Sequence, residues 1–242
     1  MKNLRAAIGF ITIVPAGASN QFDAVAMIPW FPVVGLLLGA ALAAFDQAVG
    51  RLWGPQTAAV MDVVFMAAVT GAFHLDGLAD TADGLCSHRS REQVLEIMKD
   101  SRIGAMGVVA LCSVVALKWA GISGLDQHRG LLLILVPAYA RGGILCAMRW
   151  LAYGRPAGGT GLPFFNRKLG WREFWALPAT MLLSLGLGPM ALGLNAGFAL
   201  LVAAVIAFYK RRLGCITGDM LGALTEILEA GLFLIASMGG LR

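Results

Sequence analysis

Residues 28–50 read IPWFPVVGLLLGAALAAFDQAVG, an apolar run long enough to cross a bilayer as a helix. Six further runs of this kind follow, at residues 57–75, 104–122, 130–150, 173–190, 195–209 and 220–238. Hydrophobic residues make up 58% of the chain and charged residues only 14%, which is far more apolar than a soluble domain. The sequence therefore predicts an all-α, polytopic membrane bundle of about seven spans, forming a single domain over 1–242. Six to eight spans remain open, because glycines and Pro189 interrupt the chain between the fifth and sixth.

The basic residues predict which end of the bundle faces the cytoplasm. If the N-terminus lies inside, most of the 19 Lys and Arg residues fall in inner segments, as expected for a protein of the cell (cytoplasmic) membrane. The same charges attract anionic lipid headgroups, so the bilayer itself accounts for most of the net charge of +5. No stripe of basic residues with interleaved aromatics is present, and nucleic-acid binding is not expected.

Three carboxylates gather in the segment FHLDGLADTADG at 73–84. At the helical period, Asp76, Asp80 and Asp83 fall within roughly 60° of one another on one face. Like charges this close repel unless a cation lies between them, and Mg²⁺ takes carboxylate oxygens while bridging to substrate phosphates. The three residues are therefore candidate metal ligands, with Asp83 also a candidate catalytic residue. The alternative is a solvated acidic helix start.

The predicted topology brings other polar segments to the same side. They are the Gly-rich loop at 153–163, the Thr-Gly-Asp219 motif, and Asp100-Ser-Arg102 before the third run. Asp100 or Asp219 would complete the metal site or act as a catalytic base, and Arg102 would hold a phosphate, which arginine binds bidentately. These placements predict one site, facing the cytoplasm, for water-soluble and phosphorylated substrates.

Ionisable residues inside apolar runs are costly and face a cavity or a partner. Glu226 and Glu229 lie in the last run, and Asp219 shares a helical stripe with Glu226. The glutamates are either a second half of the site, with Glu226 touching substrate, or a structural ion pair. Arg141 is either their salt-bridge partner or a clamp for phosphate. His74 is either a hydrogen-bonding partner of the substrate site or a buried core residue.

Two segments outside the spans carry separate expectations. The first 18 residues imitate a signal peptide, and the competing interpretation is a retained interfacial or re-entrant segment. Residues 92–102 predict a short amphipathic helix whose apolar face is directed at the membrane. The four cysteines form no CxxC pair and fit a reducing compartment.

Several of these motifs together resemble one enzyme family. They are FITIVP at 10–15, FPVVGLLLG at 31–39, TGAFHLDGLADTADGL at 70–85, LEIMKDSRIG at 95–104, Ala-Arg-Gly at 140–142 and TGDMLGALTEILE at 217–229. From about residue 8 to 235 the chain resembles the cobalamin 5'-phosphate synthases, also called adenosylcobinamide-GDP ribazoletransferases. Ile13 stands where that family more often has a basic residue, and residues 153–161 are a loose match.

The resemblance implies a late step of vitamin B12 biosynthesis. A hydroxyl of alpha-ribazole, or of its 5'-phosphate, would be joined to the beta-phosphoryl of adenosylcobinamide-GDP, with release of GMP and formation of adenosylcobalamin or its 5'-phosphate. One or two Mg²⁺ ions held by carboxylates would neutralise charge on the diphosphate, and Arg102 and Arg141 would hold it. The acceptor, the number of metal ions and assembly as a homo-oligomer remain open.

Two other functions remain as alternatives. Asp80-x-x-Asp83-Gly84 is similar to the Asp-rich motif of CDP-alcohol phosphotransferases, but the expected Ala-Arg is absent at Ser87-His88. A cation or metabolite transporter would instead use Glu226, Glu229 and Arg141 as its path.

Overall fold

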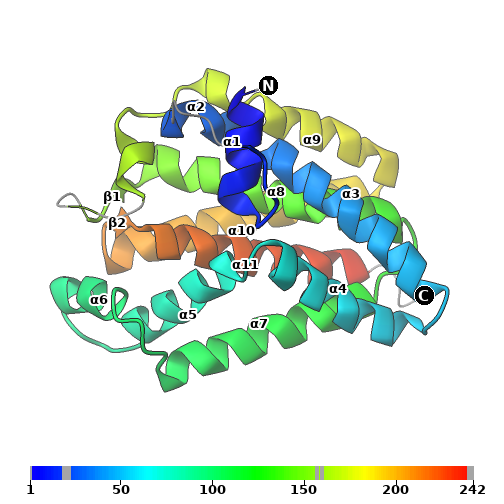
Figure 1. The fold of residues 1–242 in the computed structure, drawn as a ribbon, viewed down its shortest axis with the longest axis horizontal. Coiled ribbons are helices and arrows are strands. Elements are labelled where there is room, and N and C mark those ends of the chain that lie inside the picture. The colour runs from blue at the N-terminus through cyan, green and yellow to red at the C-terminus, as the bar shows by residue number, and fades with distance from the viewer. Residues whose placement is uncertain (1, 18–22, 156–157, 159–160, 239–242) are drawn as a thin grey trace.

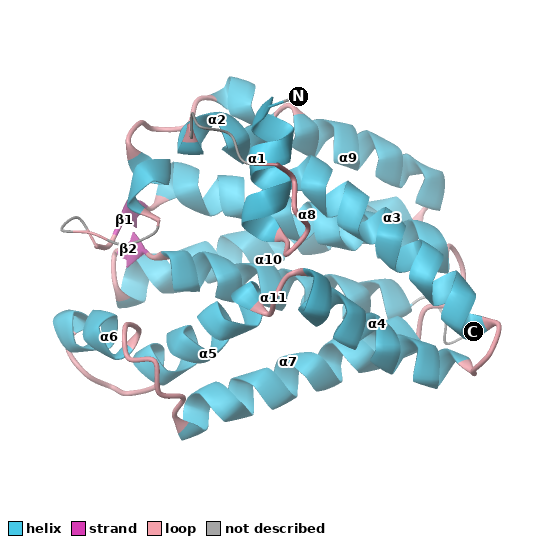
Figure 2. Ribbon diagram, viewed as in Figure 1, coloured by secondary structure: helices cyan, strands magenta, loops and turns pink. Residues whose placement is uncertain are grey.

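The computed structural model describes residues 2–17, 23–155, 158 and 161–238, and this part of the chain is almost wholly helical (Figure 2). Its one described sheet has two strands, β1 (Ala152–Tyr153) and β2 (Cys215–Ile216), which pair in parallel. The prediction of an all-α membrane bundle is confirmed.

The α-helices are α1 (Lys2–Ile11), α2 (Ala24–Met27), α3 (Phe31–Gly50), α4 (Pro55–Val69), α5 (Phe73–Leu85), α6 (Arg91–Ile97), α7 (Ala105–Ser123), α8 (Arg129–Trp150), α9 (Ala176–Ser184), α10 (Met190–Arg212) and α11 (Gly218–Ser237). Four 3-10 segments connect them: η1 (Ile28–Trp30), η2 (Leu162–Phe165), η3 (Trp171–Phe174) and η4 (Leu185–Leu187). The long helices lie along the long axis of the molecule (Figure 1).

Five helical stretches in the described chain are long and apolar enough to cross a membrane, and α4 with α5 adds a sixth. The expected span at 57–75 is not one straight helix, because α4 ends at Val69 and α5 departs from it at 91°. The bend has a backbone cause, since Gly71 and Ala72 both have positive φ, at 61° and 56°. The expected span at 173–190 is divided into η3, α9 and η4, so a count of seven is not confirmed.

Close packing of α3 on α8 fixes the centre of the bundle. A Cβ added at Gly35 would lie 2.5 Å from Ala138 Cα, and one at Gly39 would lie 2.4 Å from Ile134 O. Small residues at such crossings let two helix backbones approach closely, which is how helices associate where lipid removes the hydrophobic driving force. On the other side α8 packs against α11, which also contacts α5, α7 and α10.

Helix α1 lies across the long helices and is part of the packed structure (Figure 1). The Phe10 ring lies 6.1 Å from that of Phe31, 5.8 Å from that of Phe73 and 4.8 Å from that of Phe164. The Ile13 amide donates a hydrogen bond to Val69 O at 2.9 Å. These contacts pack α1 against the bundle, and the retained segment stays a prediction.

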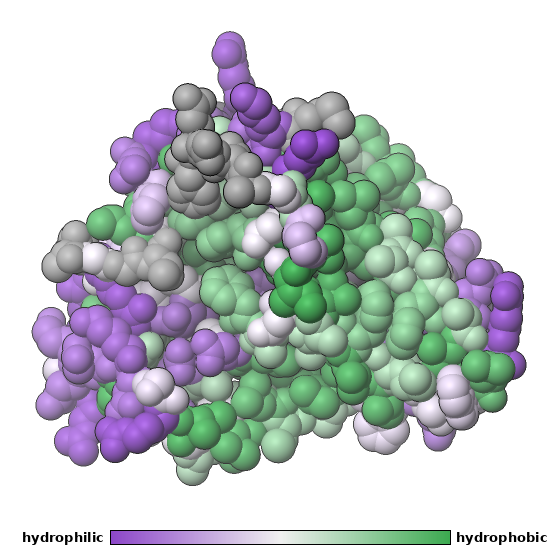
Figure 3. All heavy atoms as spheres, viewed as in Figure 1, coloured by the Kyte–Doolittle hydropathy of each residue, from purple (hydrophilic) through white to green (hydrophobic). Residues whose placement is uncertain are grey.

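On the face shown in Figure 3, a broad apolar band lies between hydrophilic regions, of which a large one is at the left. Polar residues gather where α5 ends, at α6 and beside β1 and β2, while apolar residues cover the outer faces of α3, α4 and α7. We call the former surface the polar end. Asp100-Ser-Arg102, Thr-Gly-Asp219 and the described part of the 153–163 loop lie there, whereas residues 156–157 and 159–160 of that loop fall outside the described residues.

Helix α6 is shorter than the amphipathic helix expected at 92–102. Ser90 caps its first turn in a capping box with Gln93, and the helix ends at Ile97. Val94 and Met98 are buried, and a Cβ added at Gly84 would lie 2.8 Å from Met98 Cγ. Val94 and Met98 were expected to face the membrane, but they pack against α5 instead.

Candidate functional site

The crossing of α5 and α11 brings the acidic motif together with Thr-Gly-Asp219. A Cβ added at Gly77 would lie 2.7 Å from Asp219 O, and one at Gly222 would lie 3.2 Å from His74 Cα. Gly77 of α5 faces α11 and Gly222 of α11 faces α5, so the absence of side chains lets the two helix backbones approach closely. Because Asp76 and Asp80 flank Gly77 on α5, Asp219 of α11 lies beside them.

Three other carboxylates lie near enough to Asp80 to act on it electrostatically. The charges of Asp76, Asp83 and Asp219 all act on the Asp80 carboxylate, and Arg155 is the opposing positive charge. Asp76 is exposed, whereas Asp80 and Asp83 are half-buried. Within the described residues no three His, Cys, Asp or Glu side chains converge as a ready-made metal cage. The arrangement instead leaves an excess of negative charge that a cation would offset.

Asp83 has a structural role beside its predicted one. Its carboxylate accepts hydrogen bonds from the Gly104 amide at 2.7 Å and the Gly107 amide at 2.8 Å. These amides belong to the start of α7, whose N-cap residue is a glycine without a capping side chain. Asp83 therefore caps a second helix and is held in one orientation. Its metal-binding and catalytic roles remain predictions.

Arg155 joins the loop after β1 to the acidic site. Its guanidinium forms an ion pair with Asp219 at 2.8 Å, and the Thr217 hydroxyl lies 3.3 Å from the same carboxylate. Pairing of β1 with β2 fixes this geometry, since Tyr153 lies opposite Ile216. The sequence predicted that the 153–163 loop reaches the site but did not single out Arg155. The sequence feature that could have identified Arg155 is its position as a basic residue near the start of that loop.

Asp100 and Arg102 pair with each other at the protein surface. Arg102 Nη2 donates to Asp100 Oδ2 at 2.6 Å, and the guanidinium is 86% exposed. Arg102 lowers the pKa of Asp100 to about 2, which makes this carboxylate a poor proton acceptor. Asp219 is therefore the better placed of the two predicted bases. Arg102 is accessible, and its phosphate-binding role stays a prediction.

A buried ion network lies deeper in the bundle, between α7, α8 and α11. Lys118 Nζ donates to Glu226 Oε2 at 2.6 Å and also contacts Glu229, which in turn pairs with Arg141. Arg141 is fully buried. The salt-bridge alternative for the two glutamates is thus the one the structure shows. Substrate contacts for Arg141 and Glu226 remain predictions, and both would first have to leave these ion pairs.

Lys118 is the residue of this network that sequence reasoning left unassigned. A lysine in the middle of an apolar run was the available signal. Its partners lie more than 100 positions away in the chain, so no local pattern identifies them. Two cations thus balance two carboxylates.

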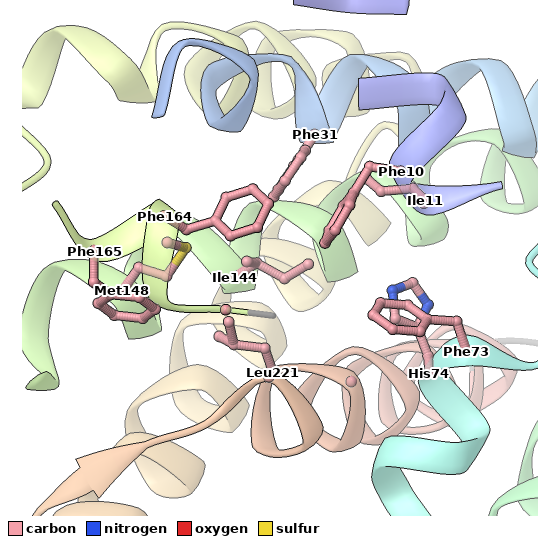
Figure 4. A pocket seen from close by; sticks show the side chains of 13 residues that line it. Phe10, Ile11, Phe31, Phe73, His74, Ile144, Met148, Phe164, Phe165 and Leu221 are labelled. Carbon is pink, nitrogen blue, oxygen red and sulfur yellow. The ribbon is translucent and has the colours of Figure 1, made fainter. Parts of the chain in front are cut away.

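His74 lies between the ion network and an aromatic pocket. Its Nδ1 is 3.5 Å from Arg141 Nη2, and its ring lines a cavity of about 50 Å³ together with Phe10, Phe31 and Phe164 (Figure 4). A benzene-sized occupant needs roughly 150 Å³. This cavity is therefore too small for a substrate ring as it stands. The buried-core alternative for His74 fits this position.

Comparisons with known proteins give one consistent result. A family described as cobalamin-5-phosphate synthase matches residues 3–237. Adenosylcobinamide-GDP ribazoletransferases from Herpetosiphon aurantiacus and Klebsiella pneumoniae strain 342 are each 37% identical to the chain. The alignments cover 95% of this chain and 93% of the first protein, and 98% and 99% for the second. No solved structure matches the chain.

Proposed function

Because this chain belongs to the cobalamin-5-phosphate synthase family, we propose that it transfers the cobinamide-phosphate group of adenosylcobinamide-GDP to alpha-ribazole or its 5'-phosphate. The oxygen of a ribazole hydroxyl forms a bond to the beta-phosphorus, the bond from that phosphorus to the GMP oxygen breaks, and GMP leaves. The observation that carries the assignment to this site is the close approach of α5 and α11 at Gly77, which sets Asp219 beside the acidic face of α5 so that three other carboxylates act on Asp80 electrostatically. Phospholipid synthesis by a CDP-alcohol phosphotransferase finds no support among the matched proteins.

The donor set at this crossing fits Mg²⁺. Mg²⁺ retains several waters and needs one or two carboxylates plus substrate phosphates, so a closed cage of three side chains is not required. Asp76 and Asp80 are the best placed ligands, because Asp83 is also bonded to two amides of α7 and Asp219 is paired with Arg155. When bound, the metal would neutralise charge on the diphosphate as the GMP oxygen departs.

The side chains around the carboxylates have separate tasks. Asp219 accepts the proton of the attacking hydroxyl, and Arg155 and Thr217 hold its carboxylate in place. Arg102, which is exposed at the adjacent loop, supplies positive charge toward the diphosphate. The capping bonds from α7 to Asp83 keep the C-terminal turn of α5 fixed while substrates exchange.

The polar end faces the cytoplasm in this proposal. Basic residues are concentrated at that end, in the loop beside α6, after α8 and at the end of α10, as expected for inner loops. The nucleotide substrate and GMP would then enter and leave from the aqueous side without crossing the bilayer.

One experiment tests the function directly. Washed membranes containing the protein are incubated with adenosylcobinamide-GDP, ribazole 5'-phosphate and Mg²⁺, and GMP and the cobalamin product are measured. Equal amounts of both are expected from open membranes, with loss on adding EDTA and recovery with Mg²⁺. Accumulation of substrate inside sealed vesicles without GMP release would instead indicate a transporter.

A further inference from the structure

A second cavity opens at the polar end, on the other side of β1 from the carboxylates. It has a volume of about 470 Å³, within the range of small-molecule sites, and is lined by residues from the end of α8, β1, η2 and the segment after η2. Its walls include three cations, Arg149, Arg167 and Lys168. None of the carboxylates assigned above lines this cleft, so its charge is opposite to that of the metal site.

The cations are incompletely paired. Arg149 Nε is buried and has no hydrogen-bond partner among the described residues. Its guanidinium lies 5.5 Å from the centroid of the Trp171 ring. Lys168 is exposed and forms no ion pair within the described chain, whereas Arg167 pairs with Glu173 at 2.7 Å. Arg149 and Lys168 thus carry positive charge on the cleft wall that no described carboxylate pairs, and an anion in the cleft would offset this charge.

Aromatic side chains line the same cleft. Tyr153 and Phe165 stack with their centroids 5.0 Å apart, and both contribute to the wall. A Cβ added at Gly161 would lie 2.9 Å from the Tyr153 ring, so the loop is fitted to this tyrosine. Flat heteroaromatic rings stack on such surfaces, and phosphate binds the arginine fork.

The cleft and the acidic site share the β1–β2 pair. Tyr153, which lines the cleft, pairs with Ile216, three residues before Asp219, and Arg155 forms an ion pair with Asp219. The Asp219 charge also acts on the Tyr153 phenol. A ligand that contacts Tyr153 in the cleft is therefore linked to the predicted base through one pair of strands.

We propose that the cleft formed by Arg149, Tyr153, Phe165 and Lys168 binds the phosphate and base of a nucleotide substrate. The inference rests on the proposed function, because it assigns a location to one of that reaction's two nucleotides. Two sources carry this chemistry: the phosphorylated acceptor and the guanosine half of the donor. Trp150, which lines the cleft, and Trp171, which lies against Arg149, are both exposed. Because tryptophan is enriched at membrane–water interfaces, a lipid headgroup is the competing occupant.

The test uses the full chain in nanodiscs of neutral phosphatidylcholine. Lys168→Gln and Arg149→Gln are compared with wild type and with Arg172→Gln, a matched control that removes an exposed charge from η3 outside the cleft. KM is measured for adenosylcobinamide-GDP, for ribazole and for ribazole 5'-phosphate. Each cleft variant is expected to raise one KM about tenfold or more, the loss of one charge-assisted hydrogen bond.

The pattern of KM values identifies the nucleotide. If KM rises for ribazole 5'-phosphate while KM for ribazole and KM for adenosylcobinamide-GDP are unchanged, the cleft binds the acceptor phosphate. A rise for the donor with either acceptor, together with weaker inhibition by GMP, assigns it to guanosine. Changes below twofold, changes equal to those of Arg172→Gln, or an effect that requires anionic lipid would overturn the proposal.

A separate readout distinguishes failure of the cleft from failure of the proposed function. Wild-type GMP release tests the function alone. Quenching of tryptophan fluorescence by GMP and by ribazole 5'-phosphate tests the cleft without turnover, because Trp150 lines the cleft and the Trp171 ring lies against the Arg149 guanidinium. Binding by wild type that is lost in Lys168→Gln supports the cleft, and equal binding by both proteins contradicts it.

Discussion

Asp80 is the carboxylate on which the charge balance of the polar end depends most. Three other carboxylates act on it and one guanidinium opposes them. Replacement by asparagine keeps the size and hydrogen-bonding capacity of the side chain but removes the charge that a cation needs.

We expect Asp80→Asn to lower GMP release by about 100-fold or more, the scale of losing one electrostatic contact to a transition state. The amount of folded, membrane-inserted protein should not change. Asp126→Asn is the matched control, since Asp126 is an exposed carboxylate between α7 and α8. Turnover of Asp80→Asn within threefold of wild type would remove Asp80 from the site.

The ion network sets a second expectation at the residue scale. Glu229 forms ion pairs with both Lys118 and Arg141, whereas the one ion pair of Glu226 in the described part of the chain is with Lys118. Glu229→Gln should therefore cost about 3–5 kcal/mol of unfolding free energy, the usual cost of leaving a buried charge unpaired. Glu226→Gln should lower the unfolding free energy by less, because Lys118 would still form an ion pair with Glu229.

A double variant separates structure from chemistry in this network. Lys118→Met with Glu226→Gln removes one charge of each sign and leaves the Arg141–Glu229 pair, so its melting temperature in detergent should exceed that of Lys118→Met alone. Recovery of GMP release along with stability would show that Glu226 is structural. Restored stability without restored turnover would place Glu226 in the reaction.

At the scale of elements, the contact between α5 and α11 positions the site. In Gly77→Ala the added methyl group would lie 2.7 Å from Asp219 O and 2.9 Å from Asp219 Cα, both backbone atoms that cannot rotate away. The helices must separate, which moves Asp219 from Asp76 and Asp80. We expect kcat to fall about tenfold or more, since small misplacements at a reacting centre are costly.

Gly193→Ala in α10 is the control for this substitution, because no atom lies within 4 Å of its added Cβ. Alanine favours a helix over glycine by about 1 kcal/mol, so intrinsic propensity predicts no loss in either variant. If Gly77→Ala and Gly193→Ala had equal kcat values, the close approach of α5 and α11 would not matter for catalysis.

The elements also show where sequence reasoning succeeded and where it stopped. Continuous apolar runs predicted α3, α7, α8, α10 and α11, because length and composition alone decide whether a helix spans. The bend between α4 and α5 was missed, since it depends on left-handed backbone at Gly71 and Ala72 within an otherwise helical pattern. Helical spacing predicted the acidic face of α5. It could not predict that Arg155 pairs with Asp219 or that Lys118 pairs with Glu226, because each pair joins distant segments of the chain.

At the scale of the whole molecule, the orientation in the bilayer can be measured. After replacement of the four native cysteines, single cysteines at positions 88 and 210 should react with a membrane-impermeant thiol reagent only from the cytoplasmic side. Cysteines at positions 54 and 126 should react only from outside. All four positions are exposed in the structure. Labelling of position 88 from outside would contradict a site that draws its nucleotide from the cytoplasm.

The packing of α1 has a consequence for how the chain acquires its shape. Phe10 contacts Phe164, which lies more than 150 positions later and is synthesised only after α8. Contacts between such distant segments form late, once the intervening chain is in place. Helix α1 can therefore pack on α3 through Phe10 and Phe31 as soon as that helix is in place, whereas its contact with η2 must wait until the spans through α8 have been made. The surroundings of the first helix are thus completed by a segment from the second half of the chain.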